Sequence, residues 1–136
     1  MKKKTILPTT LLLFTAFCLQ IFACQPNVYQ GGERIYTKYC ANCHMDNGEG
    51  LSALIPTLAK SDFLAPNRDK LPCIILHGIK DTIVVNGKTY AEEMPAMPTL
   101  SDIQITNVLN FINSSWGNQQ EPYKLEEVRA LLERCP

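Results

Sequence analysis

The sequence predicts an all-α domain of four to five helices with one small β-hairpin. Apolar residues recur at helical spacing in the segments 101–112 and 124–134, and more briefly in 32–43. An Asn86-Gly87 pair between two runs of β-branched and aromatic residues is typical of a two-residue hairpin turn. The length of 136 residues suits a single domain with one core.

The first helix is expected over residues 32–43. Ile35, Tyr36 and Tyr39 fall on one face of it, at the i, i+1 and i+4 positions. Because this face is apolar and the flanking positions are polar, we expect it to pack against the rest of the domain.

Two helical segments are expected in the middle of the chain. Ser61 or Asp62 can cap a short turn of helix. Residues 69–76 predict a longer helix, in which Pro72 suits the first turn and Gly78 follows the end.

Residues 82–90 predict the hairpin, with Asn86-Gly87 as a type I′ turn. The hairpin leads into a loop braced by Pro95 and Pro98. Each proline fixes φ and removes a backbone donor, so this loop is neither helix nor strand interior.

The strongest helical pattern begins at Ser101. We expect this helix to cross the first one, with Val108 and Phe111 packing near Gly32 and Tyr36, because glycine permits close approach. Residues 124–134 predict a last amphipathic helix, with acidic residues early and Arg134 late. The apolar positions of the two helices are Ile105, Val108, Leu109, Phe111 and Ile112, then Leu125, Val128, Leu131 and Leu132.

The N-terminus predicts an export signal over residues 1–23. Lys2 to Lys4 precede an apolar run of signal-peptide length that is too short for a comfortable membrane span. The run ends in Ile21-Phe22-Ala23-Cys24, which resembles a bacterial lipobox. We therefore expect a lipid on Cys24, a polar tether over 24–31, and a periplasmic protein anchored to the inner or outer membrane. The alternative is an ordinary signal peptide that is cleaved near Ala23.

The central motif is Cys40-Ala41-Asn42-Cys43-His44, a C-x-x-C-H sequence that is the attachment signature of c-type haem. Two thiols add to the two vinyl groups of the porphyrin, and a helical turn sets the sulfurs at the separation of those vinyls. The histidine then lies beneath the iron and binds it. A redox dithiol and half of a zinc site are the rival interpretations. No βαβ pattern supports the first, and no second ligand pair supports the other.

The second axial ligand has three candidates: Met94, Met97 and His77. A stiff proline loop can hold a thioether against the iron, which favours Met94, with Met97 as the fallback. A lone methionine is more often a core residue, so the loop context carries this choice. His77 precedes a helix-ending glycine and would give a bis-histidine site.

Six cysteines need assignment. Cys18 lies in the expected signal peptide, and Cys24 and the haem motif account for three more. The remaining pair, Cys73 and Cys135, could form a disulfide in an oxidising compartment, or could remain unpaired.

The chain resembles class I c-type cytochromes over about residues 31–118. The resemblance implies a cytochrome c fold around one covalently bound haem, a cytochrome domain over 32–118, and a C-terminal helix, 119–136, packed on it. It also implies that Met94 is the iron ligand and that the Pro56 carbonyl accepts the proton of the ligand imidazole. Pro56, Leu58, Tyr90 and Leu100 are the expected haem-pocket residues. The motifs that carry the resemblance are Gly32-Glu33-Arg34-Ile35-Tyr36, Pro56-Thr57-Leu58-Ala59, Ser61-Asp62-Phe63-Leu64, Leu76-His77-Gly78, Val84 to Tyr90, Met94-Pro95-Ala96-Met97-Pro98, Leu100-Ser101-Asp102 and Asn113 to Asn118.

These features predict an electron carrier and not an enzyme. After loss of the signal peptide, ten Lys/Arg face thirteen Asp/Glu, and no basic stripe suggests nucleic-acid binding. The expected partners are redox proteins, such as a membrane-associated oxidase, reductase or dehydrogenase. Glu92 and Glu93 place negative charge near the expected haem edge, which predicts a basic or apolar partner. The alternatives are a dedicated electron-entry subunit of a respiratory or dehydrogenase complex, and a ligand-binding or peroxidatic haem protein.

Overall fold

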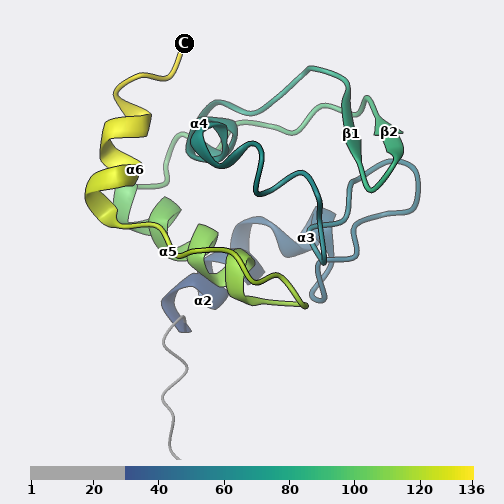
Figure 1. Cartoon of the computed structure of the whole chain (residues 1–136), viewed down its shortest axis with the longest axis horizontal. Coiled ribbons are helices and arrows are strands. Elements are labelled where there is room, and N and C mark those ends of the chain that lie inside the picture. Colours follow the sequence, from purple (N-terminus) through teal and green to yellow (C-terminus); the bar gives the residue numbers. More distant parts are fainter. Residues whose placement is uncertain (1–29) are drawn as a thin grey trace, which may run out of the picture.

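The computed structural model describes residues 30–136 (Figure 1). The expected signal peptide, the lipid site Cys24 and tether residues 25–29 lie outside the described residues. The described elements are helices α2 (Gln30–Tyr39), α3 (Ala41–His44), α4 (Leu71–His77), α5 (Asp102–Ser114) and α6 (Leu125–Leu132), the 3₁₀ turn η1 (Arg68–Lys70), and strands β1 (Ile83–Val85) and β2 (Lys88–Tyr90). This confirms a helical domain with one small antiparallel sheet. Among the described residues, no helix is both long and apolar enough to span a bilayer.

Helices α2 and α5 cross at the bottom of the molecule in Figure 1, as the sequence predicts. A Cβ on Gly32 would lie 2.7 Å from Cβ of Phe111, so only glycine allows the two backbones to approach this closely. The Tyr36 ring packs against Phe111 and Trp116, with centroids 5.4 and 4.9 Å away. This cluster anchors the end of the chain segment that leads to the C-x-x-C-H motif.

The expected first helix is interrupted at Cys40, so that 32–43 is not one continuous helix. α2 begins at Gln30, inside the expected tether, and ends at Tyr39; α3 then forms a separate single turn. Cys40 lies between the two with its amide donating to the Tyr36 carbonyl. The single turn of α3 then carries Cys43 and His44 of the motif.

The middle of the chain is less helical than the sequence predicts. Residues 62–67 form successive turns and no helix, with the Phe63 amide donating to the Ser61 hydroxyl. The expected helix over 69–76 is a 3₁₀ turn followed by α4, which has Pro72 in its first turn and Gly78 as C-cap. α4 is thus only two turns long, and its position depends on what it packs against.

The hairpin forms as predicted. β1 and β2 pair in the register Ile83↔Tyr90 and Val85↔Lys88, and both turn residues, Asn86 and Gly87, have positive φ. The hairpin buries Val85 and Tyr90 against the domain, which leaves its other face in solvent.

The C-terminal half has the two predicted helices. Ser101 caps α5 in a reciprocal capping box with Gln104, and the helix buries Ile105, Val108, Leu109 and Ile112. α6 buries Val128 and Leu131 and packs on both α5 and α4. The core therefore extends from the α2–α5 crossing up to α4 and α6.

Candidate cofactor-binding site

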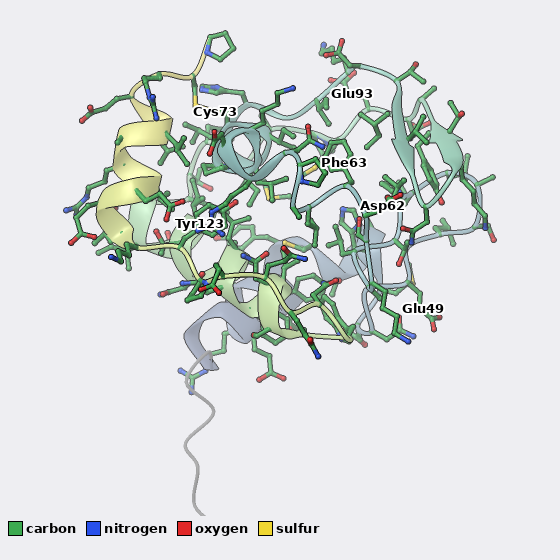
Figure 2. All side chains as sticks on the ribbon, in the orientation of Figure 1. Glu49, Asp62, Phe63, Cys73, Glu93 and Tyr123 are labelled. Atoms are coloured by element: carbon green, nitrogen blue, oxygen red, sulfur yellow. A yellow bond between two sulfur atoms is a disulfide. The ribbon has the colours of Figure 1, made fainter. Side chains whose placement is uncertain are left out.

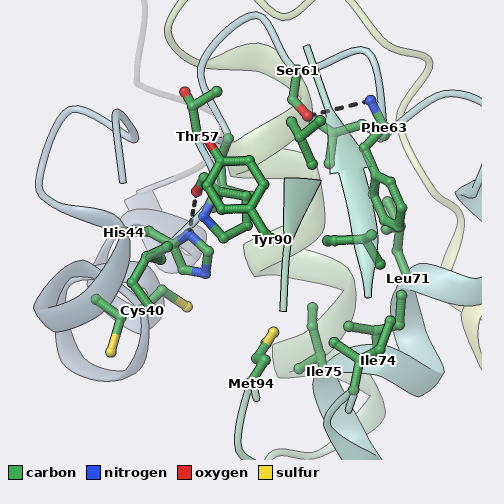
Figure 3. A pocket seen from close by; sticks show the side chains of 18 of the residues that line it. Cys40, His44, Thr57, Ser61, Phe63, Leu71, Ile74, Ile75, Tyr90 and Met94 are labelled. Atoms are coloured by element: carbon green, nitrogen blue, oxygen red, sulfur yellow. Dashed lines mark hydrogen bonds between the residues drawn. The ribbon is translucent and has the colours of Figure 1, made fainter. Parts of the chain in front are cut away.

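A largely apolar cavity opens between the C-x-x-C-H motif, helix α4, the hairpin and the loop after it (Figure 3). The walls combine residues from the N-terminal, middle and C-terminal parts of the sequence. Its lining residues include Cys40, Cys43, His44, Ile55, Pro56, Leu58, Phe63, Leu71, Ile74, Ile75, Ile79, Ile83, Val85, Tyr90, Met94, Leu109 and Ile112.

His44 is oriented by one hydrogen bond to the loop that faces it. Its Nδ1 lies 3.1 Å from the carbonyl oxygen of Pro56. A carbonyl can only accept, so Nδ1 carries the proton and Nε2 keeps a free lone pair. Burial lowers the pKa of His44, while the bond to Pro56 acts in the opposite direction. The imidazole is therefore suited to be a neutral metal ligand through Nε2.

The two thiols of the motif are both free, and they differ in exposure. Cys40 is buried and Cys43 is exposed. Burial, helped by the charge of the neighbouring Cys43 thiolate, raises the pKa of Cys40 to about 11. The amides of Cys43 and His44 both donate to the Cys40 carbonyl, at 3.1 and 2.9 Å, which closes the turn that sets their spacing.

A second bond network holds the turn after His44, and sequence reasoning missed it. The hydroxyl of the buried Tyr36 donates to the Met45 carbonyl at 2.6 Å, and the Gly50 amide donates to the His44 carbonyl at 3.0 Å. Met45 has a φ of 63°, a backbone conformation that residues other than glycine rarely adopt. The hydroxyl of Tyr36 thus fixes the backbone immediately after His44, the candidate iron ligand.

Met94 lines the cavity, whereas the other two candidates for the second ligand do not. Its backbone forms an isolated antiparallel bridge with Ile79, with N–H to O=C distances of 2.9 and 3.0 Å. In Figure 3 the Met94 thioether points into the cavity from the loop after the hairpin, on a different side from His44. Met97 packs on the core and His77 is exposed at the end of α4.

Three of the four expected pocket residues, Pro56, Leu58 and Tyr90, line the cavity. The fourth, Leu100, is buried in the core and is not among the lining residues. Sequence reasoning missed the apolar wall made by Ile74 and Ile75 of α4. The signal for it was present in the unbroken apolar run of that helix, which has to face something apolar.

The rim of the cavity is acidic. Asp81, Glu92 and Glu93 are among its lining residues, and Glu93 pairs with Lys80 at 3.2 Å. Both members of that pair are more than half exposed, so the pair is a weak, salt-sensitive contact.

These residues fit a c-type haem. The cavity offers two free thiols, an imidazole with an available Nε2, a thioether sulfur and an apolar wall. Cys73 and Cys135 take no part in the cavity wall: they form a disulfide, with Cα atoms 5.6 Å apart, that joins α4 to the end of the chain.

Comparison with known proteins supports this assignment. The family model described as "Cytochrome C oxidase, cbb3-type, subunit III" matches residues 27–112. "Cytochrome c-552" of Thermus thermophilus is 35% identical over 109 residues, covering 74% of this chain and 82% of that protein. "Gluconate 2-dehydrogenase cytochrome c subunit" of Pantoea cypripedii is 41% identical over 93 residues, covering 65% of this chain and 21% of that protein. "Alcohol dehydrogenase (quinone), cytochrome c subunit" of Komagataeibacter europaeus is 37% identical over 93 residues, covering 65% and 19%.

Proposed function

This chain belongs to the family of c-type cytochromes and serves in electron transfer, and we propose that it is a lipid-anchored carrier with one haem c. The sequence contains one C-x-x-C-H motif, which supports a single haem. The observation that carries the proposal is that His44 and Met94 line the same apolar cavity from different elements.

In this proposal Cys40 and Cys43 would hold the haem through thioether bonds, and His44 and Met94 would bind its iron. The bound haem supplies a one-electron couple between Fe(II) and Fe(III). Two protein ligands leave no open position for a substrate, which supports electron transfer without catalysis. The apolar wall and the thioether ligand favour a higher reduction potential than a bis-histidine site would have.

The proposed membrane anchor is supported by the lipobox-like sequence that ends at Cys24. Six peptide links join Cys24 to Gln30, where α2 begins, and six links reach at most about 20 Å. A domain on such a tether stays close to the bilayer. This supports redox partners that expose their own centres near the same membrane surface, in the bacterial periplasm.

The acidic rim indicates the chemistry of the partner. Glu92 and Glu93 border the cavity, and Lys80 offsets only one of these charges. We expect the docking face of the partner to be basic or mostly apolar, since like charges would oppose the approach.

A dedicated subunit of a dehydrogenase complex is the second candidate. It is favoured by the similarity to cytochrome c subunits of gluconate and quinone-dependent alcohol dehydrogenases, of which this chain spans about a fifth. Co-purification separates the two candidates: a free carrier leaves its partner at moderate salt, and a subunit remains bound to it.

The decisive test is a reduced-minus-oxidised spectrum of the exported protein, combined with mass spectrometry. We expect the spectrum of a c-type haem, a mass that exceeds the processed, lipidated polypeptide by one haem, and a Met–iron charge-transfer band in the oxidised form. A colourless, folded protein with the bare polypeptide mass would contradict the proposal. Carbon monoxide binding by the reduced form would instead support a ligand-binding or peroxidatic haem protein.

A further inference from the structure

We infer that the C-terminal strap, residues 119–136, positions Met94 through helix α4, with the Cys73–Cys135 disulfide as its principal link. The inference rests on the proposed role of Met94 as the iron ligand. The strap lies beyond the family match, which ends at residue 112. The contacts that the strap makes are therefore additional to those within the matched region, and we infer that they fix the position of the Met94 loop.

The first step is the attachment of the Met94 loop to α4. Ile79, just after the helix, exchanges two backbone hydrogen bonds with Met94, at 2.9 and 3.0 Å. The Met97 amide donates to the Ile75 carbonyl at 3.0 Å. At Gly78 the two chains are in such close contact that an added Cβ would collide with the Met94 carbonyl. The backbone that carries the thioether consequently follows any movement of the end of α4.

The second step is that α4 is too short to be stable alone and depends on its neighbours, which are α5 and the strap. The helix has seven residues, about two turns, and isolated helices of that length are not stable in water. The strap contacts this part of the chain at two points. The disulfide joins Cys73 of α4 to Cys135 of the strap. Arg68 of η1, the turn that precedes α4, also binds the strap.

The Arg68 clamp is a set of directed contacts. The guanidinium makes two hydrogen bonds to the Glu127 carboxylate, at 2.9 and 3.0 Å, and a third to the Glu121 carbonyl at 2.6 Å. It lies 3.8 Å from the centroid of the Tyr123 ring, whose hydroxyl donates to the Arg68 carbonyl at 2.7 Å. Figure 2 shows Cys73 and Tyr123 in the region between α4 and α6.

The third step is the attachment of the strap to the rigid part of the domain. The Asn110 side chain, on α5, accepts from the Tyr123 amide at 2.7 Å and donates to the Tyr123 carbonyl at 3.0 Å. Val128 is fully buried against the core. The strap is thus a brace between α5, which is part of the core, and α4, which carries the Met94 loop.

The test removes the disulfide and asks whether the Met94 loop responds more than the core does. In the haem-loaded Cys73→Ser/Cys135→Ser protein, we expect the reduced form to bind carbon monoxide about tenfold more tightly, because the apparent affinity rises with the fraction of molecules whose Met94 has left the iron. Backbone amide exchange at Ile79 and Met94 is expected to accelerate by at least the same factor, while exchange at Val108 changes much less.

Phe111→Leu is the matched control, because it weakens the aromatic cluster of Tyr36, Phe111 and Trp116 at the α2–α5 crossing, a cluster that includes no residue of α4 or of the strap. We expect it to leave carbon monoxide binding at the wild-type level. The inference is wrong if both variants raise binding equally, or if Val108 exchanges as fast as Met94, since either result indicates general destabilisation. Unchanged binding and exchange in the disulfide variant would overturn it as well.

If the double variant fails to fold, the wild-type haem protein can be treated with a small dithiol. The dithiol transfers two hydrogens to Cys73 and Cys135, becomes a cyclic disulfide, and leaves the haem thioethers intact. The same carbon monoxide and exchange readouts then decide. A protein that never shows a c-type spectrum contradicts the proposed function. A protein with a c-type spectrum whose carbon monoxide binding and amide exchange do not respond to loss of the disulfide contradicts only the inference about the strap.

Discussion

Gly78 and the Met94 carbonyl lie in direct contact, closer than any side chain at position 78 would permit. Gly78 has a φ of +78° and ends α4. The same glycine allows the Met94 loop to pack directly against the end of the helix.

Gly78→Ala is expected to displace the Met94 loop and to destabilise the protein by about 1–3 kcal/mol, through positive φ and collision with the Met94 carbonyl. Carbon monoxide titration of the reduced form and chemical denaturation measure the two effects. Gly87→Ala is the matched control: Gly87 has a φ of +75°, but nothing lies within 4 Å of an added Cβ. Equal carbon monoxide binding by the two variants would contradict the prediction.

Met94→Ala is expected to open the sixth coordination position, so that the oxidised form loses its Met–iron band and the reduced form binds carbon monoxide. Met97→Ala should keep both properties of the wild type, because Met97 does not line the cavity. Absorption spectra of both variants measure this. A lost band in Met97→Ala with a retained band in Met94→Ala would reverse the ligand assignment.

Tyr36→Phe is expected to cost about 1–3 kcal/mol of stability, because it leaves the Met45 carbonyl without its 2.6 Å hydrogen bond in a partly buried site. Chemical denaturation of the haem-loaded protein gives the value. Tyr39→Phe is the control, since the Tyr39 hydroxyl has no hydrogen-bond partner within residues 30–136 and should change stability by only a few tenths of a kcal/mol. Similar losses in both variants would count against a specific role for the bond.

Glu127→Gln is expected to remove part of the acid sensitivity of folding. The hydrogen bonds from Arg68 hold the pKa of Glu127 below its usual value of 4.5, so the folded state binds this proton less readily than the unfolded state. The resulting stability is present above pH 4.5 and is lost as the pH falls through the lower, folded-state pKa. The pair is about one-third exposed, so we expect a loss of only about 0.5–1 kcal/mol at neutral pH.

Denaturation at pH 7 and pH 3 measures this effect, with Glu126→Gln as the control for loss of one carboxylate on the same helix turn. Glu126 is exposed and forms none of the salt bridges among the described residues. An unchanged difference between the two pH values in Glu127→Gln would show that the ion pair adds no acid sensitivity.

Replacement of both Glu92 and Glu93 by glutamine is expected to lower the rate of electron transfer to a basic partner severalfold at low salt and to flatten its dependence on ionic strength. Stopped-flow measurements at a series of salt concentrations provide the test. Glu33→Gln on α2 removes a charge away from the cavity and should leave the slope nearly unchanged. An unaltered slope in the double variant would exclude these two residues from docking.

Local features of the sequence were sufficient to predict much of the fold and the C-x-x-C-H side of the site. The start of α5 at Ser101, the Asn86-Gly87 turn and the apolar stripe of α5 depend on residues a few positions apart, and each formed as predicted. The C-x-x-C-H turn is local for the same reason, since its spacing alone brings Cys40, Cys43 and His44 to one cavity.

Contacts between distant parts of the chain decided the rest. Propensity did not indicate the break at Cys40, the missing helix near Ser61 or the position of Leu100 outside the cavity wall. The sequence favoured Met94 over Met97 from its loop context, but only the tertiary structure places Met94 in the cavity wall, where its backbone pairs with Ile79. That pairing, and the strap that holds α4 beneath it, join residues far apart along the chain. The free energy of forming these contacts includes the entropy of bringing distant segments together, which cannot be judged from a short stretch of sequence.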